Sequence, residues 1–154
     1  DSEELQLKGE AFKLSTSKKA YFSARFKLSD ATESDMLLGL AITDTTAIDG
    51  VTDGVFFKKD DGDTNLDFVV EKDSTETATA AVGTVADDTF ITATFFIDPD
   101  RAKVYYSINN AAPVGVANTN LPDDEELTVT IAVQAGAAAA KSLTVDYVSA
   151  IIER

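Results

Sequence analysis

Apolar and polar side chains alternate strictly along much of this chain, and that alternation constrains its fold more than any other feature. In residues 21–28, Phe22, Ala24 and Phe26 alternate with polar or charged neighbours, which is typical of a β-strand with one face in a core and the other in water. The same period of two returns in residues 36–42, 66–70, 91–97, 104–108 and 127–135. A helical period is almost absent, so the sequence predicts an all-β protein.

Turn-forming residues separate these alternating segments. Asp98-Pro99-Asp100 joins two long segments, so residues 89–109 are predicted to form a hairpin with Pro99 in its turn. The alanine-rich residues 135–141 are too few to stabilise a helix, and we predict a loop or a single turn there. Strands that follow one another without a βαβ pattern indicate an antiparallel two-sheet jelly-roll sandwich of about ten or more strands.

The length of the chain and its missing residue types narrow the class of protein further. A chain of 154 residues with 44% hydrophobic side chains suits one domain; we expect it to span residues 1–154, with residues 1–10 as an extended N-terminal segment. The chain has no His and no Cys, so it lacks the residues for a Ser-His-Asp or Cys-His nucleophile and for the usual zinc sites. Its apolar runs are shorter than the roughly 18 residues of a membrane span. We therefore expect no membrane partner and no cofactor.

The charge of the chain is strongly acidic and unevenly distributed. The formal net charge is −14, which argues against nucleic acid as a partner because a phosphate backbone is bound by clustered Lys and Arg. Residues 1–27, however, carry six basic side chains against four acidic ones. This segment is either an ordinary solvated face or a surface that docks on an acidic neighbour. In the second case we expect Lys13, Lys18 and Lys19 to make the contact.

An acidic stretch, residues 55–73, raises three alternatives: a calcium loop, a catalytic site and a charged hairpin. Asp61, Asp63 and Asn65 have the spacing of the first ligands of an EF-hand loop. The EF-hand register then fails at both its Gly and its bidentate Glu positions, the second of which holds Lys72. We predict a charged hairpin, and only a calcium site of another kind stays open.

Paired carboxylates, as in glycoside hydrolases, are the catalytic alternative. Asp67 and Glu71 are predicted to share one face of a strand, but four residues of a strand separate them by about 13 Å, which is too far for a retaining pair. The chain also has no Trp to stack on a sugar. We therefore expect no enzymatic activity, no catalytic residue and no metal site.

Three blocks of the sequence resemble a family of virion structural proteins of tailed bacteriophages: AYFSARFKLSDATESDMLLGLAITDTT, GVFFKKDDGDTNLDFVVEKDST and NLPDDEELTVTIAVQAGAAAAKSLTVDYVSAIIER. The resemblance covers residues 8–154 and depends on the order of the blocks. The closing LTVDYV also resembles the last strand of concanavalin-like jelly rolls, among them laminarinase-type glycoside hydrolases. Those hydrolases carry a Glu-x-Asp-x-x-Glu motif on a strand. Glu71, Asp73 and Glu76 have its spacing, but the aromatic surroundings of the hydrolase site are missing.

The bacteriophage resemblance implies a capsid decoration or head-stabilising protein without catalytic activity, on the exterior of the virion capsid. Its partners would be the major capsid protein and further copies of itself, as a homo-oligomer, with docking through the three lysines. The concanavalin-like resemblance implies the same fold and an alternative function, a carbohydrate-binding lectin-like module on a virion or cell surface. In that alternative, Tyr21, Tyr105 and Tyr106 are the candidates to stack on a sugar.

Overall fold

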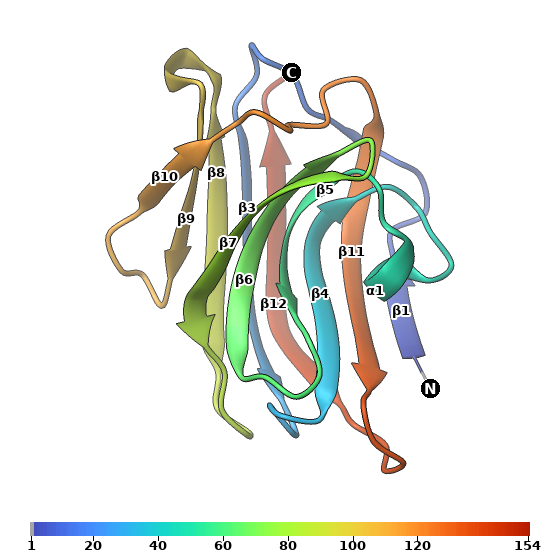
Figure 1. Cartoon of the computed structure of the whole chain (residues 1–154). Helices are drawn as coiled ribbons and strands as arrows, with labels where there is room; N and C mark the ends of the chain where they lie inside the picture. Colours follow the sequence, from blue (N-terminus) through green and yellow to red (C-terminus); the bar gives the residue numbers. More distant parts are fainter. Residues whose placement is uncertain (1) are drawn as a thin grey trace.

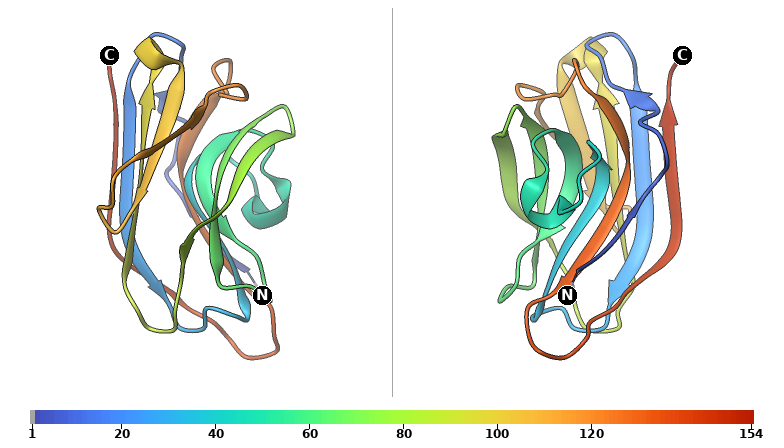
Figure 2. Two further views of the ribbon diagram at one scale, coloured as in Figure 1. Left: turned by 60° about the vertical axis from the view of Figure 1, so that its left-hand side comes forward. Right: turned by 90° about the vertical axis from the view of Figure 1, so that its right-hand side faces the viewer.

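The computed structural model describes residues 2–154, which consist almost entirely of β-strands (Figure 1). In this part of the chain, twelve strands form one seven-stranded and one five-stranded sheet, and there are two short helical segments. The named strands all pair in the antiparallel sense. The two sheets pack face to face (Figure 2), which confirms the predicted antiparallel jelly-roll sandwich.

The seven-stranded sheet has the order β1-β11-β4-β5-β6-β7, and β2 also pairs with β11. Its strands are β1 (Ser2–Gln6), β2 (Phe12–Lys13), β4 (Ser34–Ala41), β5 (Gly54–Lys59), β6 (Asn65–Lys72), β7 (Thr75–Thr84) and β11 (Glu126–Ala135). The edge strand β1 thus occupies part of the segment that was expected to be extended.

The five-stranded sheet has the order β10-β9-β8-β3-β12. Its strands are β3 (Ala20–Leu28), β8 (Ile91–Asp98), β9 (Lys103–Ile108), β10 (Val114–Ala117) and β12 (Leu143–Ile152). The hairpin predicted over residues 89–109 is confirmed, because β8 and β9 pair and a 3₁₀ helix, η1 (Pro99–Arg101), makes the turn. Residues 136–141 form a loop, as predicted.

The inner faces of the two sheets form the main hydrophobic core. Phe57 and Phe68 of the seven-stranded sheet meet Phe95 of the five-stranded sheet, with ring centroids 6.2 and 5.8 Å apart. Phe95 also stacks on Phe22 at 5.1 Å. All four side chains are fully buried, and burying each large apolar side chain stabilises the fold by about 1.5–3 kcal/mol. The alternating pattern therefore places the aromatic side chains where the two sheets meet.

A four-residue helix, α1 (Ala47–Gly50), lies on the outer face of the seven-stranded sheet (Figure 2) and was not predicted. A helix this short is unstable by itself. Ala47 packs with Leu37, Phe56 and Val69 in a second, smaller apolar cluster, and this packing holds the helix on the sheet. Neither helical segment of residues 2–154 is long and apolar enough to cross a membrane.

Candidate functional site

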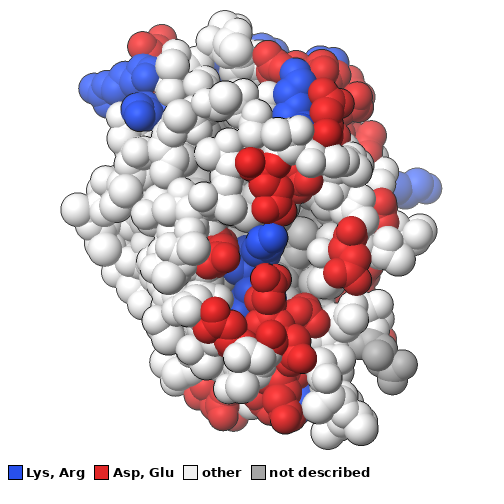
Figure 3. All heavy atoms as spheres, in the orientation of Figure 1, with Lys and Arg blue, Asp and Glu red and all other residues white. Residues whose placement is uncertain are grey.

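A hollow of about 280 Å³ opens on the outer face of the seven-stranded sheet, beside α1. We call it the charged hollow, since its lining combines apolar and charged side chains, among them Leu37, Asp49, Val51, Lys58, Glu71 and Glu76. Figure 3 looks onto this face and shows basic atoms near its centre with acidic groups around them. The sheet thus brings charges of both signs together in one depression.

The β6–β7 hairpin places two carboxylates of the charged hollow side by side. Glu71 of β6 and Glu76 of β7 lie directly opposite each other, and such pairs have Cβ atoms about 4.5–5.5 Å apart. Asp73 and Ser74 form the turn between them, with φ angles of 50° and 59°, as a two-residue type I′ turn requires. Lys58 reaches this pair from β5, and its Nζ lies 3.1 Å from Oε1 of Glu76.

Glu71 is the buried member of this group, with 6% of its surface exposed. Burial raises the pKa of its carboxyl group to about 7; repulsion from Glu76 and Asp53 adds to the increase, and Lys58 partly opposes it. Among residues 2–154, no side-chain hydrogen bond and no ion pair involves this carboxyl group. The oxygens of Glu71 are not fully enclosed, so they can donate or accept hydrogen bonds at the hollow according to their protonation.

Lys58 supplies the positive charge of the hollow. Burial disfavours its ammonium group, but the hydrogen bond and the attraction of Glu76, with the charges of Asp60 and Asp67, outweigh burial and raise its pKa. The neighbouring Lys59 also borders the hollow, but it is only 1% exposed. Its ammonium group donates to two backbone carbonyls, and burial lowers its pKa. Of these two lysines, only Lys58 can meet a ligand.

The charged hollow can hold a small ligand that carries both hydroxyl groups and apolar faces. Lys58 donates hydrogen bonds, Glu76 accepts them, and Glu71 does either according to its protonation state. Leu37 and Val51 add apolar surface beside these groups. A few polar groups that converge on an otherwise apolar lining are the usual composition of a ligand site.

The hydrolase-like motif that the sequence suggested does not occupy a single strand. Glu71 and Glu76 lie on different strands with Asp73 in the turn between them, so three acidic side chains do not project from one strand. The other catalytic candidate, Asp67, lies at a bulge of β6. Its Oδ1 accepts a hydrogen bond of 2.7 Å from the backbone N–H of Ala81, which gives this carboxylate a structural role at the bulge.

The acidic stretch is a charged hairpin, as predicted, with β5 and β6 paired on either side of residues 60–64. The Asp63 carboxylate accepts hydrogen bonds from the backbone and side-chain amides of Asn65, at 3.0 and 2.8 Å. These bonds are typical of a turn. Over residues 2–154, no group of three or more acidic side chains is arranged to hold a metal ion.

The predicted docking lysines contact other parts of the same chain. The Nζ of Lys13 donates to the backbone carbonyl of Asp124 at 3.2 Å, and the Nζ of Lys19 lies 3.0 Å from Oδ2 of Asp100. Lys18 is exposed and pairs with Ser15 across a short turn. Docking on a capsid through Lys13, Lys18 and Lys19 stays a prediction.

Two of the three tyrosines that were candidates to stack on a sugar share one surface. Tyr21 and Tyr105 both line a hollow on the outer face of the five-stranded sheet. Tyr106 also borders this hollow, but its ring packs on Phe68 in the core, with centroids 5.3 Å apart. Because neighbouring residues of a strand face opposite sides of the sheet, Tyr105 and Tyr106 cannot both face the same ligand.

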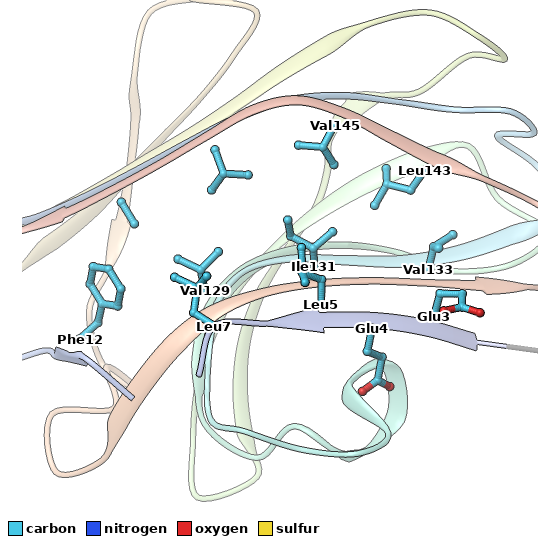
Figure 4. A pocket seen from close by; sticks show the side chains of 12 residues that line it. Glu3, Glu4, Leu5, Leu7, Phe12, Val129, Ile131, Val133, Leu143 and Val145 are labelled. Carbon is cyan, nitrogen blue, oxygen red and sulfur yellow. The ribbon is translucent and has the colours of Figure 1, made fainter. Parts of the chain in front are cut away.

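A third hollow, of about 630 Å³, lies between β1 and β11 on one side and β12 on the other (Figure 4). Leu5, Ile131 and Val145 are among its mainly apolar walls. Glu4 points away from it toward α1, where its carboxylate accepts a 2.8 Å hydrogen bond from the N–H of Ala47. Apolar walls alone do not orient a polar ligand, so the charged hollow is the better candidate site.

The sequence matches no family model and no curated protein, but solved structures share its architecture. Congerin II with bound lactose and MES is 12% identical over 98% of this chain and 100% of that chain, with a TM-score of 0.54. The metal-free carbohydrate recognition domain of Emp46p is 13% identical over 97% of this chain and 76% of that one, with a TM-score of 0.68. A native glycosidic hydrolase is 14% identical over 83% of this chain and 62% of that one, with a TM-score of 0.59.

At these identities the likenesses show the fold alone. The chain has the jelly-roll sandwich that it shares with galectins and with the Emp46p domain, and this confirms the fold that the concanavalin-like resemblance implied. The comparisons give no support to the bacteriophage resemblance. The fold of this chain is a two-sheet lectin-like jelly roll.

Proposed function

We propose that this protein is a carbohydrate-binding module whose ligand lies in the charged hollow, against Lys58, Glu71 and Glu76. The observation that carries the proposal is the carboxyl group of Glu71, which lines the hollow beside Lys58 and Glu76 and forms no side-chain hydrogen bond within residues 2–154. Its oxygens are not fully enclosed, so they face the hollow. A sugar hydroxyl in the hollow can therefore bind to them.

The solved structures with this fold support a binding role. One holds lactose, and another is named as a carbohydrate recognition domain. A hydrolase also shares the fold, but in this chain the acidic motif is divided by the Asp73–Ser74 turn. We therefore propose binding without hydrolysis.

The test is a glycan array, followed by calorimetric titration of the saccharide that is retained most tightly. Lys58→Met removes the donor and keeps the length of the side chain. The loss of one hydrogen bond to a charged group, worth about 1.5–3 kcal/mol, should weaken binding by about tenfold or more.

Lys27→Met is the matched control on the opposite sheet. Lys27 and Lys58 each form an ion pair, at 2.8 and 3.1 Å, and the side chain of each is 27% exposed. The control variant should bind the saccharide like the wild type. An array without any bound saccharide, or equal weakening by both substitutions, would contradict the proposal.

A further inference from the structure

The outer face of the five-stranded sheet carries a row of partly exposed aromatic and apolar side chains in register. Tyr21 of β3 pairs with Phe96 of β8, and Phe96 pairs with Tyr105 of β9. Ile151 of β12, which is 61% exposed, extends the row beyond Tyr21. Neighbouring strands are about 4.8 Å apart, so the three aromatic residues span about 10 Å. We call them the aromatic row.

Gly115 lets the last ring of the aromatic row lie flat. It is the partner of Tyr105 on β10, and a Cβ atom there would come within 2.8 Å of Cε1 of Tyr105. The ring of Tyr105 therefore lies across the β10 backbone. The aromatic row borders a hollow of about 500 Å³, which Thr94, Ser107 and Pro113 also line.

Asp98 lines the same hollow and has a carboxylate oxygen without a partner. Its side chain is 9% exposed, and Oδ1 is buried without a hydrogen bond, the one such side-chain atom found in residues 2–154. The other oxygen, Oδ2, lies 3.4 Å from Nη1 of Arg101, too long for a strong bond. Buried polar atoms are nearly always hydrogen-bonded, so Oδ1 indicates a donor that arrives with a ligand.

We infer that the aromatic row and Asp98 form a second saccharide site, which takes a β-linked glucan. A glucan ring with equatorial hydroxyl groups has apolar faces that stack on Tyr and Phe rings. Its hydroxyl groups at the ring edge can donate to Oδ1 of Asp98 and accept from Arg101. Asp98 and Arg101 carry opposite charges and form an ion pair, so this hollow has no net charge to hold an organic cation, the other ligand that aromatic rings favour.

The site does not depend on the charged hollow, because the two lie on outer faces of opposite sheets. Two sites that face away from each other would let one molecule bridge two glycan chains. Binding of a multivalent surface would then be tighter than either site alone allows.

The probe is cellohexaose, titrated by calorimetry into wild-type protein and four variants. We expect binding that Tyr105→Ala weakens by up to about tenfold, since stacking on one ring is lost. Asp98→Asn keeps the shape of its side chain and should also weaken binding. Tyr147→Ala removes an exposed tyrosine outside the hollow and should not. Lys58→Met should leave cellohexaose binding intact, which separates this site from the charged hollow.

Thermal unfolding of each variant checks that the sandwich is intact, and Asp98→Asn keeps the test decisive if Tyr105→Ala does not fold. Three results would overturn the inference. One is wild-type protein that does not bind cellohexaose, and another is binding that survives both Tyr105→Ala and Asp98→Asn. The third is a wild-type protein that does not bind cellohexaose but forms a dimer in sedimentation experiments, when Tyr105→Ala abolishes that dimer. This result would show that a second copy of the chain covers the aromatic row.

Discussion

The outer faces of the two sheets differ far more than their inner faces do. Both inner faces contribute phenylalanines to one core, as Phe57 and Phe95 do. Outside, the seven-stranded sheet carries the charged hollow and α1, whereas the five-stranded sheet carries the aromatic row with a line of hydroxyl groups beside it, where Ser23 and Thr94 lie 2.8 Å apart. The shared inner side chains form the core of the sandwich, and the different outer side chains are the basis of the two ligand sites that we propose.

The largest effect is expected where the two sheets meet. Phe95→Ala removes a fully buried ring that contacts three other aromatic rings. It should lower the free energy of unfolding by about 3–5 kcal/mol. It should also weaken ligand binding on both outer faces, because both sheets pack on this core. Phe90→Ala, at a partly exposed ring under Arg25, should cost less than half as much. Urea denaturation measures both, and equal losses would contradict the shared core.

Two glycines allow each outer face to be perturbed separately. A Cβ atom at Gly39 would overlap with the carbonyl oxygen of Val55 and with Cα of Phe56, which belong to the backbone. Gly39→Ala should therefore destabilise the protein by about 1–3 kcal/mol and weaken binding in the charged hollow.

The matched change on the other sheet is Gly115→Ala, which meets only the movable ring of Tyr105. It should lower the free energy of unfolding by less than about 1 kcal/mol. It should weaken binding of cellohexaose but not binding in the charged hollow. Urea denaturation and calorimetry of both variants give the comparison. If both substitutions weaken both ligands equally, the two faces are not independent.

A further effect depends on pH and belongs to the charged hollow. The pKa of Glu71 is raised from 4.5 to about 7, so the folded protein holds a proton that the unfolded chain releases between these values. The stability that Glu71 contributes should therefore fall by about 1–2 kcal/mol as the pH rises from 4.5 to 7, allowing for solvent in the hollow. No His titrates in this interval, since the chain has none.

Glu71→Gln should remove this contribution. Urea denaturation of wild type and variant at several pH values gives the difference between their stabilities, in which the other carboxylates cancel. The free energy of unfolding of the wild type should fall relative to that of the variant as the pH rises. At high pH the variant should be the more stable of the two. Parallel curves would mean that Glu71 titrates as an ordinary glutamate.

The sequence predicted the strands whose inner residues are large and apolar, because alternation is visible only where the two faces differ in size and polarity. β7 was not predicted, since its Thr and Ala side chains give no such contrast. α1 was missed because four residues carry no helical period, and their position depends on a cluster with Phe56 and Val69 from other strands.

The candidate sites were only partly predictable for a related reason. The spacing of Glu71 and Glu76 was visible in the sequence, but their meeting across a hairpin depends on the Asp73–Ser74 turn. The aromatic row joins Tyr21 to Tyr105 through two strand registers. A shift of one residue in either pairing would turn a ring to the other face, so composition alone could not place these tyrosines together.

The charged hollow can be tested directly as the carbohydrate site by amide NMR of the protein during titration with the saccharide that the glycan array retains most tightly. We expect the largest shifts to map to β5, β6 and β7 around Lys58, Glu71 and Glu76, and Lys58→Met to reduce them at the same saccharide concentration. Shifts confined to residues outside the charged hollow, or unchanged in the variant, would contradict the assignment of the carbohydrate site.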